Sequence, residues 1–306
     1  MYKFDNILIC LDLTEMDDFL ISYANYIADT FKPHNITFIH VMESFNLPEE
    51  MASDFPELDA PLKDIIREEL EEKIKASYDE DSSVSQKLEL LEGHTTEEIV
   101  NYARSNKITL TLMGKKIGYL GRGGVVLKIL GLIPSSVLLI SETAHRTMKR
   151  LMVRMDYSRI SAIALKMAGA IVEQTKGSTQ CLRVIKVPIT YFPQQTKAAE
   201  LKLKTQLTQH AAKEYKKFLK RQKFNEQEFP CEYAVDFKGD EAQIIYNKAI
   251  QNDIDLLIIG SKIKSSMANV ILDSTSEKLA GVEKNIPVLI VKDRKQSIGF
   301  LEALFD

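Results

Sequence analysis

The sequence predicts an α/β protein made of two copies of one domain, each a parallel sheet covered by helices. Residues 93–117 and 239–263 resemble each other, and each run has the pattern of an amphipathic helix followed by a buried strand that ends in Gly. The two runs lie 146 residues apart (239 against 93), which is too long for a solenoid repeat and is the size of a whole domain. Short apolar runs alternate with helical patterns throughout, as in parallel sheets.

The chain is expected to divide near residue 146. Its 306 residues allow about two domains, and we place the first at 1–146 and the second at 147–306. The junction, residues 141–149, is short and polar. We therefore expect the two halves to pack together.

Ten apolar runs, five in each half, are predicted as strands. Their short length and branched residues are typical of strands buried on both faces of a parallel sheet. The runs are 6–11, 36–42, 88–91, 108–113 and 137–140 in the first half, and 151–155, 181–187, 231–235, 254–259 and 288–291 in the second.

Helical spacing of apolar residues separates these strands. The helices are expected over 15–30, 62–74, 97–104 and within 121–131 in the first half, and over 160–172, 197–220 and the start of the 239–263 repeat in the second. Pro61 suits the first turn of the helix that follows it. Thr95 or Thr96 is expected to cap the helix over 97–104.

Charge is distributed unequally between the halves. The chain has a net charge of −3, of which residues 1–146 contribute −11 and residues 147–306 contribute +8. Two solvated helix faces that diverged after duplication would explain this contrast. Alternatively, opposite charges orient the halves against each other or against a partner. Contact with nucleic acid is a third, weaker alternative, because the basic segment lacks interleaved aromatic residues or a known motif.

Several classes of protein and site are not supported. No apolar run approaches the ~18 residues needed to span a membrane, and the N-terminus lacks the pattern of a signal peptide. The three cysteines and five histidines show no metal or redox spacing. We therefore expect a cytoplasmic protein with no membrane contact and no metal, and can name no catalytic residue.

Each half resembles a universal stress protein domain. The resemblance rests on the first strand with its terminal Asp (ILICLDLTE and LMVRMDYSR), on the Gly-led helix and strand of the repeat, and on the closing segments IPSSVLLIS and NIPVLIVKD. With one such domain in each half, the resemblance covers nearly the whole chain. It implies a doubly wound, five-stranded parallel sheet of order 3-2-1-4-5 in each half, the fold of the adenine-nucleotide α-hydrolase-like proteins.

The resemblance also implies a nucleotide site at the carboxyl ends of the strands. ATP-binding members carry Gly-x-x-Gly, nine residues, and then Gly-Ser or Gly-Thr, and glycines at such a switch point let phosphates approach backbone N–H groups. The positions that match the family's site are Asp12, Gly114, Gly123 and Gly124 in the first half, and Asp156, Gly260 and Ser274 in the second.

Both halves depart from this motif. Ile117 and Ile263 stand where the second Gly is expected, and a branched side chain there takes space that phosphates would need. Asp273 replaces the third Gly in the second half, and its carboxylate would repel phosphates. The Gly-rich loop of the first half, with Lys115 nearby, could form an anion site of its own or could be only a flexible turn; such a loop alone is a weak signal.

Two functions from different classes follow. The first is a non-enzymatic stress or regulatory protein that acts by dimerisation and protein partner binding, with degenerate nucleotide sites and no cofactor. The second is a switch that binds ATP or AMP, with the first half the better site. Family members pair through strand five, so 137–140 and 288–291 could pair within one chain or between copies. A small-molecule enzyme is a third and weaker alternative.

Overall fold

The computed structural model describes residues 4–46, 61–77, 84–115, 124–187, 196–261, 264–266, 269–271, 274–281, 285–293 and 297. Its strands are β1 Asn6–Cys10, β2 Asn35–Met42, β3 Ser85–Glu92, β4 Leu110–Lys115, β5 Ser136–Ser141, β6 Arg150–Arg154, β7 Ser178–Lys186, β8 Cys231–Asp236, β9 Leu256–Gly260, β10 Lys264–Ser266, β11 Asn269–Ile271 and β12 Val288–Val291. Its helices are α1 Met16–Phe31, α3 Leu62–Ser77, α4 Thr95–Ser105, α5 Gly124–Leu132, α6 Arg159–Thr175, α7 Lys197–Gln222, α8 Glu241–Gln251 and α9 Ser274–Gly281.

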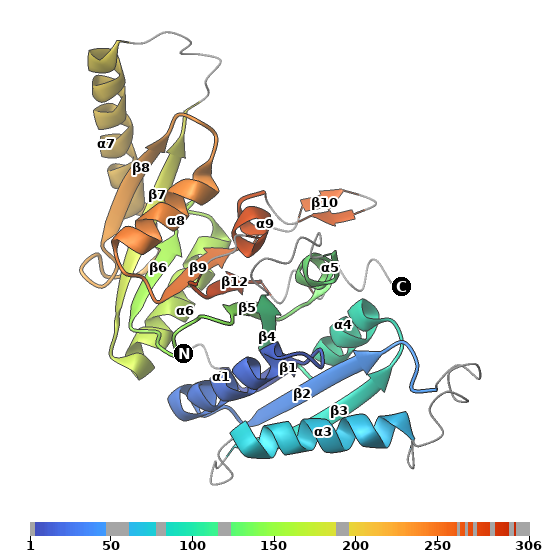
Figure 1. The fold of residues 1–306 in the computed structure, drawn as a ribbon. Helices are drawn as coiled ribbons and strands as arrows, with labels where there is room; N and C mark the ends of the chain where they lie inside the picture. The colour runs from blue at the N-terminus through green and yellow to red at the C-terminus, as the bar shows by residue number, and fades with distance from the viewer. Residues whose placement is uncertain are drawn as a thin grey trace.

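Ten of these strands form one continuous sheet (Figure 1). Its order is β3-β2-β1-β4-β5-β12-β9-β6-β7-β8, so each half has the order 3-2-1-4-5 that was predicted. Within this sheet, all strand pairs inside one half are parallel. The prediction of two doubly wound α/β units is confirmed.

The two halves meet at strand five. β5 and β12 pair antiparallel, with Leu138 opposite Leu289 and the flanking residues paired symmetrically around them. An approximate two-fold axis therefore passes between these two leucines. All the residues of β5 and β12 are buried, which adds an apolar contribution to the backbone hydrogen bonds of this seam.

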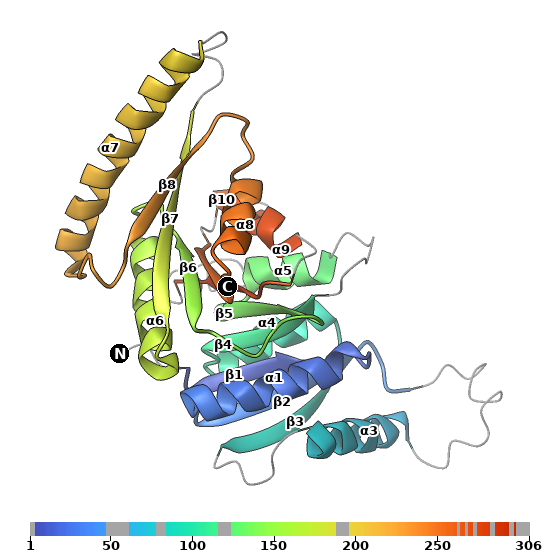
Figure 2. The ribbon, with the colours of Figure 1, turned by 60° about the vertical axis from the view of Figure 1, so that its left-hand side comes forward.

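Helices cover both faces of the sheet (Figures 1 and 2). One hydrophobic core contains residues of α1, α3, α6 and α7, and it runs across both halves. The second core, on the other face, contains residues of α4, α5, α8 and α9. Met148, in the junction between the halves, is buried in the first core, so the halves share one interior.

Some local details differ from the sequence predictions. The helix after Gly93 already begins at Thr95, and its N-cap is His94, whose side chain makes no capping hydrogen bond. The expected caps at Thr95 and Thr96 are therefore wrong. The third strand is longer than predicted, because polar residues at an edge strand do not interrupt its backbone pairing with β2. The hairpin β10–β11 was not predicted, and most of the tail after residue 293 lies outside the described residues.

Candidate functional site

The carboxyl ends of the first and fourth strands of each half form the expected site. In the first half, Asp12 follows β1 and Gly114 lies near the end of the neighbouring strand β4. In the second half, Asp156 follows β6 and Gly260 ends β9. The fold thus brings each Asp to the same edge of the sheet as its Gly. This is the edge where ligands bind in doubly wound folds.

In the first half, the turn after β1 is occupied by a buried carboxylate from α1. The backbone N–H groups of Asp12 and Leu13 donate to the two carboxylate oxygens of Asp17, each over 2.9 Å. Leu13 has a φ of 59°, and this left-handed residue turns the two N–H groups toward one acceptor. Asp17 is 0% exposed. A side chain of the protein therefore takes the place that an external anion could occupy.

The charge around this turn is negative. Burial raises the pKa of Asp17, the hydrogen bonds from the backbone of Asp12 and Leu13 lower it, and the nearby charge of Asp12 raises it again, so that the pKa lies above its usual value. Asp12 itself is exposed and accepts a hydrogen bond of 2.5 Å from the hydroxyl of Thr14. Two carboxyl groups so close together oppose the approach of a phosphate chain.

The second half builds the same turn with hydroxyls. Tyr157 has a φ of 62° and matches Leu13. The N–H of Asp156 donates to the hydroxyl of Ser161 over 3.1 Å, and Ser161 takes the place of Asp17. Asp156 accepts hydrogen bonds from both Ser158 and Ser161. Ser158 is also the N-cap of α6.

The two motif glycines are covered by helix side chains. A Cβ atom built on Gly114 would lie 2.5 Å from Cγ of Met16, and one built on Gly260 would lie 2.8 Å from Cγ1 of Ile160. Met16 is the first residue of α1 and Ile160 is the second residue of α6, and they are 2% and 8% exposed. The space that each glycine opens is therefore filled by protein.

The second half also has a buried ion cluster at this edge. The carboxylate of Glu241, at the start of α8, lies 2.7 Å from Nε of Arg154 and 2.9 Å from Nζ of Lys186, and it accepts a hydrogen bond of 3.0 Å from Thr275. Burial raises the pKa of Glu241, but the hydrogen bonds and charges of Arg154 and Lys186 outweigh this, and its pKa lies below the usual value. The register places Cys10 of the first half where Arg154 stands.

The remaining predicted site residues lie in the closing loops. Gly124 begins α5 and is exposed, and within the described part of the chain no atom lies within 4 Å of a Cβ built on it. Ser274 begins α9, whose next residue, Thr275, contacts Glu241. Gly123, Ile117, Ile263 and Asp273 lie outside the described residues, so the predictions made for them stay predictions.

The side chains that close this edge were not predicted from the sequence: Met16, Asp17, Arg154, Ile160, Ser161 and Glu241. Aligning the halves from the first strand, with 144 residues between Asp12 and Asp156, would have paired Met16 with Ile160 and Asp17 with Ser161. Charged residues at the end of a strand and the start of a helix were the available signal for Arg154 and Glu241.

Neither a membrane span nor a metal centre is found in the part of the chain that the structure describes. No described helix is both long and apolar enough to cross a membrane. No group of three or more His, Cys, Asp or Glu side chains within the same residues could hold a metal ion.

Comparisons with known proteins agree with the fold. A functionally unknown protein from Pseudomonas aeruginosa PAO1 has a similar structure, with a TM-score of 0.66 and 15% identity over 98% of this chain and 96% of the other. A universal stress protein from Archaeoglobus fulgidus DSM 4304 gives a TM-score of 0.60 and 14% identity over 95% and 97%. A universal stress protein solved in complex with cAMP gives a TM-score of 0.31 and 20% identity over 47% of this chain and 95% of the other. A search of curated proteins gives no match.

The profile of the universal stress protein family matches the sequence twice, at residues 3–141 and 147–292. The two matches cover most of the chain and correspond to the two five-stranded units of the sheet. The chain belongs to the universal stress protein family, as a tandem protein with two such domains.

Proposed function

We propose that this protein is a non-enzymatic regulator of the stress response that acts through dimerisation and protein partners, with nucleotide sites that no longer bind. Membership of the universal stress protein family supports the stress-response role. The proposed loss of nucleotide binding rests on one observation. Both glycine sites are filled, by Met16 over Gly114 and by Ile160 over Gly260.

Electrostatics supports the same proposal. In the first half, Asp12 and Asp17 place two carboxyl groups beside the turn where phosphates would approach. In the second half, Glu241 pairs with both Arg154 and Lys186, so this cluster keeps one net positive charge, and Lys186 is 58% exposed. The electrostatic argument against a bound polyanion is therefore strongest in the first half.

An exposed helix supports the partner-binding part. The sequence of α7 contains eight Lys or Arg residues against two Glu, and its four buried residues all lie in its second half. Its N-terminal end reaches past the tips of β7 and β8 (Figure 2). Leu201 is 65% exposed there. A basic helix with accessible leucines is a suitable surface for an acidic protein partner.

Calorimetry tests the proposal directly. We expect no heat when ATP with Mg²⁺, AMP or cAMP is added to the full chain at about 100 μM. Native mass spectrometry of the purified protein should show no retained nucleotide. Micromolar binding that is lost in Asp12→Ala but kept in Asp156→Ala would refute the proposal and establish a first-half site.

The alternative is a switch that binds ATP or AMP in the first half. One observation favours it: no atom of the described residues lies within 4 Å of a Cβ built on Gly124, at the start of α5, and the N-terminus of a helix attracts phosphate. The variant Met16→Ala would then enlarge the site. If Met16→Ala gains ATP affinity while Ile160→Ala does not, the first half retains the rest of a nucleotide site.

Sedimentation at two salt concentrations tests assembly. If the charge contrast between the halves drives association of whole chains, dimers that form at low salt should dissociate at about 0.5 M NaCl, where screening is strong. A dimer unaffected by salt would contradict the electrostatic part of the proposal.

A further inference from the structure

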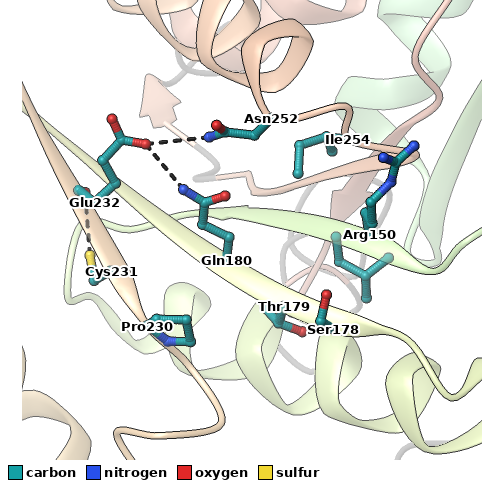
Figure 3. A pocket seen from close by; sticks show the side chains of 10 residues that line it. Arg150, Ser178, Thr179, Gln180, Pro230, Cys231, Glu232, Asn252 and Ile254 are labelled. Atoms are coloured by element: carbon teal, nitrogen blue, oxygen red, sulfur yellow. Dashed lines mark hydrogen bonds between the residues drawn. The ribbon is translucent and has the colours of Figure 1, made fainter.

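A hollow among the described residues lies at the edge of the sheet opposite the nucleotide-type crevices. It has a volume of about 630 Å³ and is formed at the amino ends of β6, β7 and β8 (Figure 3). This volume is in the range of small-molecule sites. None of the residues that close the carboxyl edge takes part in it.

A carboxylate orients two amides around this hollow. Oε2 of Glu232 accepts hydrogen bonds from Nε2 of Gln180 over 3.1 Å and from Nδ2 of Asn252 over 3.4 Å (Figure 3). A carboxylate only accepts, so it fixes both amides with their NH₂ groups toward it. The carbonyl oxygens of Gln180 and Asn252 then remain as acceptors for a ligand that carries N–H donors.

The charge of Glu232 is already balanced. Nζ of Lys248 lies 2.5 Å from Oε1 of Glu232. The carboxylate therefore orients the amides without presenting an unpaired charge. An ammonium group would bind to the two amide oxygens, with the negative end of each amide dipole toward it.

A guanidinium lies at the other end of the hollow. Arg150 is half exposed, and its NH2 donates to Asp255 over 3.3 Å. The contact between its NH1 and Asp253 is longer, at 3.5 Å, and Asp253 is 77% exposed. Arg carries five N–H donors, so Arg150 retains donors for a ligand carboxylate.

The wall between these ends contains a buried hydroxyl without a partner. Thr179 is 5% exposed, and its Oγ1 has no hydrogen bond among the described residues. A buried hydroxyl without a partner is costly and suggests a group that a ligand or water completes. Beside it, Leu151 and Ile254 are buried and apolar. A ligand here meets polar groups at its ends and apolar surface along its length.

The first half has only part of this set. The strand register places Asn6 at the position of Arg150, Ile36 at that of Thr179 and Lys87 at that of Pro230. Nζ of Lys87 lies 3.0 Å from Glu89 and 5.3 Å from the ring centre of Tyr102, so its side chain lies across this edge. By the same register and repeat, Glu89 and Asn106 of the first half match Glu232 and Asn252. Arg150, Thr179 and Gln180 have no such counterpart, so these three groups are particular to the second half.

We propose that the hollow at the amino ends of β6–β8 binds a free aliphatic L-amino acid. The amide oxygens of Gln180 and Asn252 would receive the α-ammonium group, Arg150 the α-carboxylate, and Leu151 and Ile254 the aliphatic side chain. The site goes beyond the regulatory function proposed above and does not depend on it, because it lies on the opposite edge of the sheet.

Calorimetry and saturation-transfer NMR with L-leucine test this site in the full chain. We expect binding with a Kd below about 1 mM. L-leucinamide, which lacks the carboxylate, and 4-methylpentanoate, which lacks the ammonium group, should each bind at least about tenfold more weakly, since each loses a charged hydrogen-bonding partner. Equal binding of all three compounds, or no binding of L-leucine at 10-fold above that Kd, would overturn the proposal.

Matched variants locate the site. Arg150→Ala and Thr179→Val should weaken L-leucine binding by about tenfold and about threefold, whereas Asn6→Ala and Ile36→Val, at the equivalent positions of the first half, should leave it unchanged. Thermal unfolding verifies that each variant is folded. Thr179→Val is nearly isosteric and removes a hydroxyl without a partner, so it should fold at least as well as the parent. Unchanged binding in both second-half variants would place the amino acid elsewhere and refute the site.

Discussion

The two carboxyl-edge crevices have the same backbone and are closed by different chemistry. The first is filled by a flexible apolar side chain, Met16, and by one buried carboxylate that accepts backbone N–H groups, Asp17. The second is filled by a stiff branched side chain, Ile160, and by an ion cluster centred on Glu241. The comparison indicates that one crevice of an ancestral domain was filled in two separate ways. The two halves should therefore respond differently to equivalent substitutions.

The largest difference is expected at Glu241. Glu241→Ala leaves Arg154 nearly buried and without its carboxylate, which should cost about 3–5 kcal/mol of unfolding free energy. Thr95→Ala, at the equivalent position of the first half, should cost less than about 1 kcal/mol. Urea denaturation of both variants measures the difference. Equal losses would mean that the two crevices are stabilised alike.

The pH dependence sharpens this prediction. The pKa of Glu241 is lower in the folded protein than its usual value of 4.5. Its contribution to stability is therefore present above pH 4.5 and lost as the pH falls through the lowered pKa. The stability difference between the parent and Glu241→Gln should shrink over that acidic range.

The next largest difference in stability between the halves is expected at the motif glycines, Gly260 and Gly114. Gly260→Ala should cost about 1–3 kcal/mol, because Ile160 is β-branched and its backbone carbon is only 3.3 Å from the new Cβ. Gly114→Ala should cost less, although Met16 is closer, since methionine can adopt another rotamer. Thermal unfolding of both variants shows which substitution destabilises the protein more. Combining Gly260→Ala with Ile160→Ala should recover part of the loss, and no recovery would show that the clash involves the backbone.

A buried lysine at the seam has a counterpart without charge. Lys292 is 2% exposed, its ammonium group donates to the carbonyl of Leu130, and burial lowers its pKa from 10.5 to about 8. Ser141 of the first half lies at the equivalent position in the register. We expect Lys292→Met to stabilise the protein by about 1–3 kcal/mol at pH 7, because it removes the cost of burying a charge.

The sign of the pH effect provides the control. The pKa of Lys292 is lower when folded, so the cost of burying it is full below about pH 8 and decreases as the pH rises from about 8 toward 10.5. The advantage of Lys292→Met should therefore shrink over that range, while Ser141→Ala should show no such trend. An advantage that is constant with pH would contradict burial of the charge.

The smallest expected difference concerns the helix caps. Ser158→Ala should cost about 1 kcal/mol, because Ser158 caps α6 through the backbone N–H of Ser161. Thr14→Ala should cost less, since the N-cap of α1 is Glu15, which makes no capping hydrogen bond. Chemical denaturation can resolve this difference. A larger loss for Thr14→Ala would show that its hydrogen bond to Asp12 matters more than capping.

The sequence predicted the fold well because the required signals are local. The ten strands are short apolar runs, and the similarity of 93–117 to 239–263 indicated duplication. Strand and helix ends were less certain. The caps expected at Thr95 and Thr96 were wrong because the chain enters α4 one residue after Gly93, whose φ of 141° favours glycine.

The candidate site was only partly predictable because its contacts are distant in sequence. Asp12 and Gly114 follow from strand ends, but a local pattern does not reveal that Met16 covers Gly114, 98 residues away (114 against 16). Glu241 lies 87 residues from Arg154 and 34 from Thr275. Side-chain pairs of this kind depend on the assembled sheet. The amino-edge hollow had no sequence motif at all.

The antiparallel pairing of β5 with β12 has a consequence for how the two halves could evolve. Two separate copies joined by such an edge would dissociate on dilution, and any change to the edge would occur on both sides at once. Within one chain, the effective concentration of one half for the other is independent of the protein's concentration. The tether removes the requirement for symmetry, so each half can acquire its own charge, its own filled crevice and its own surface while the joint is retained.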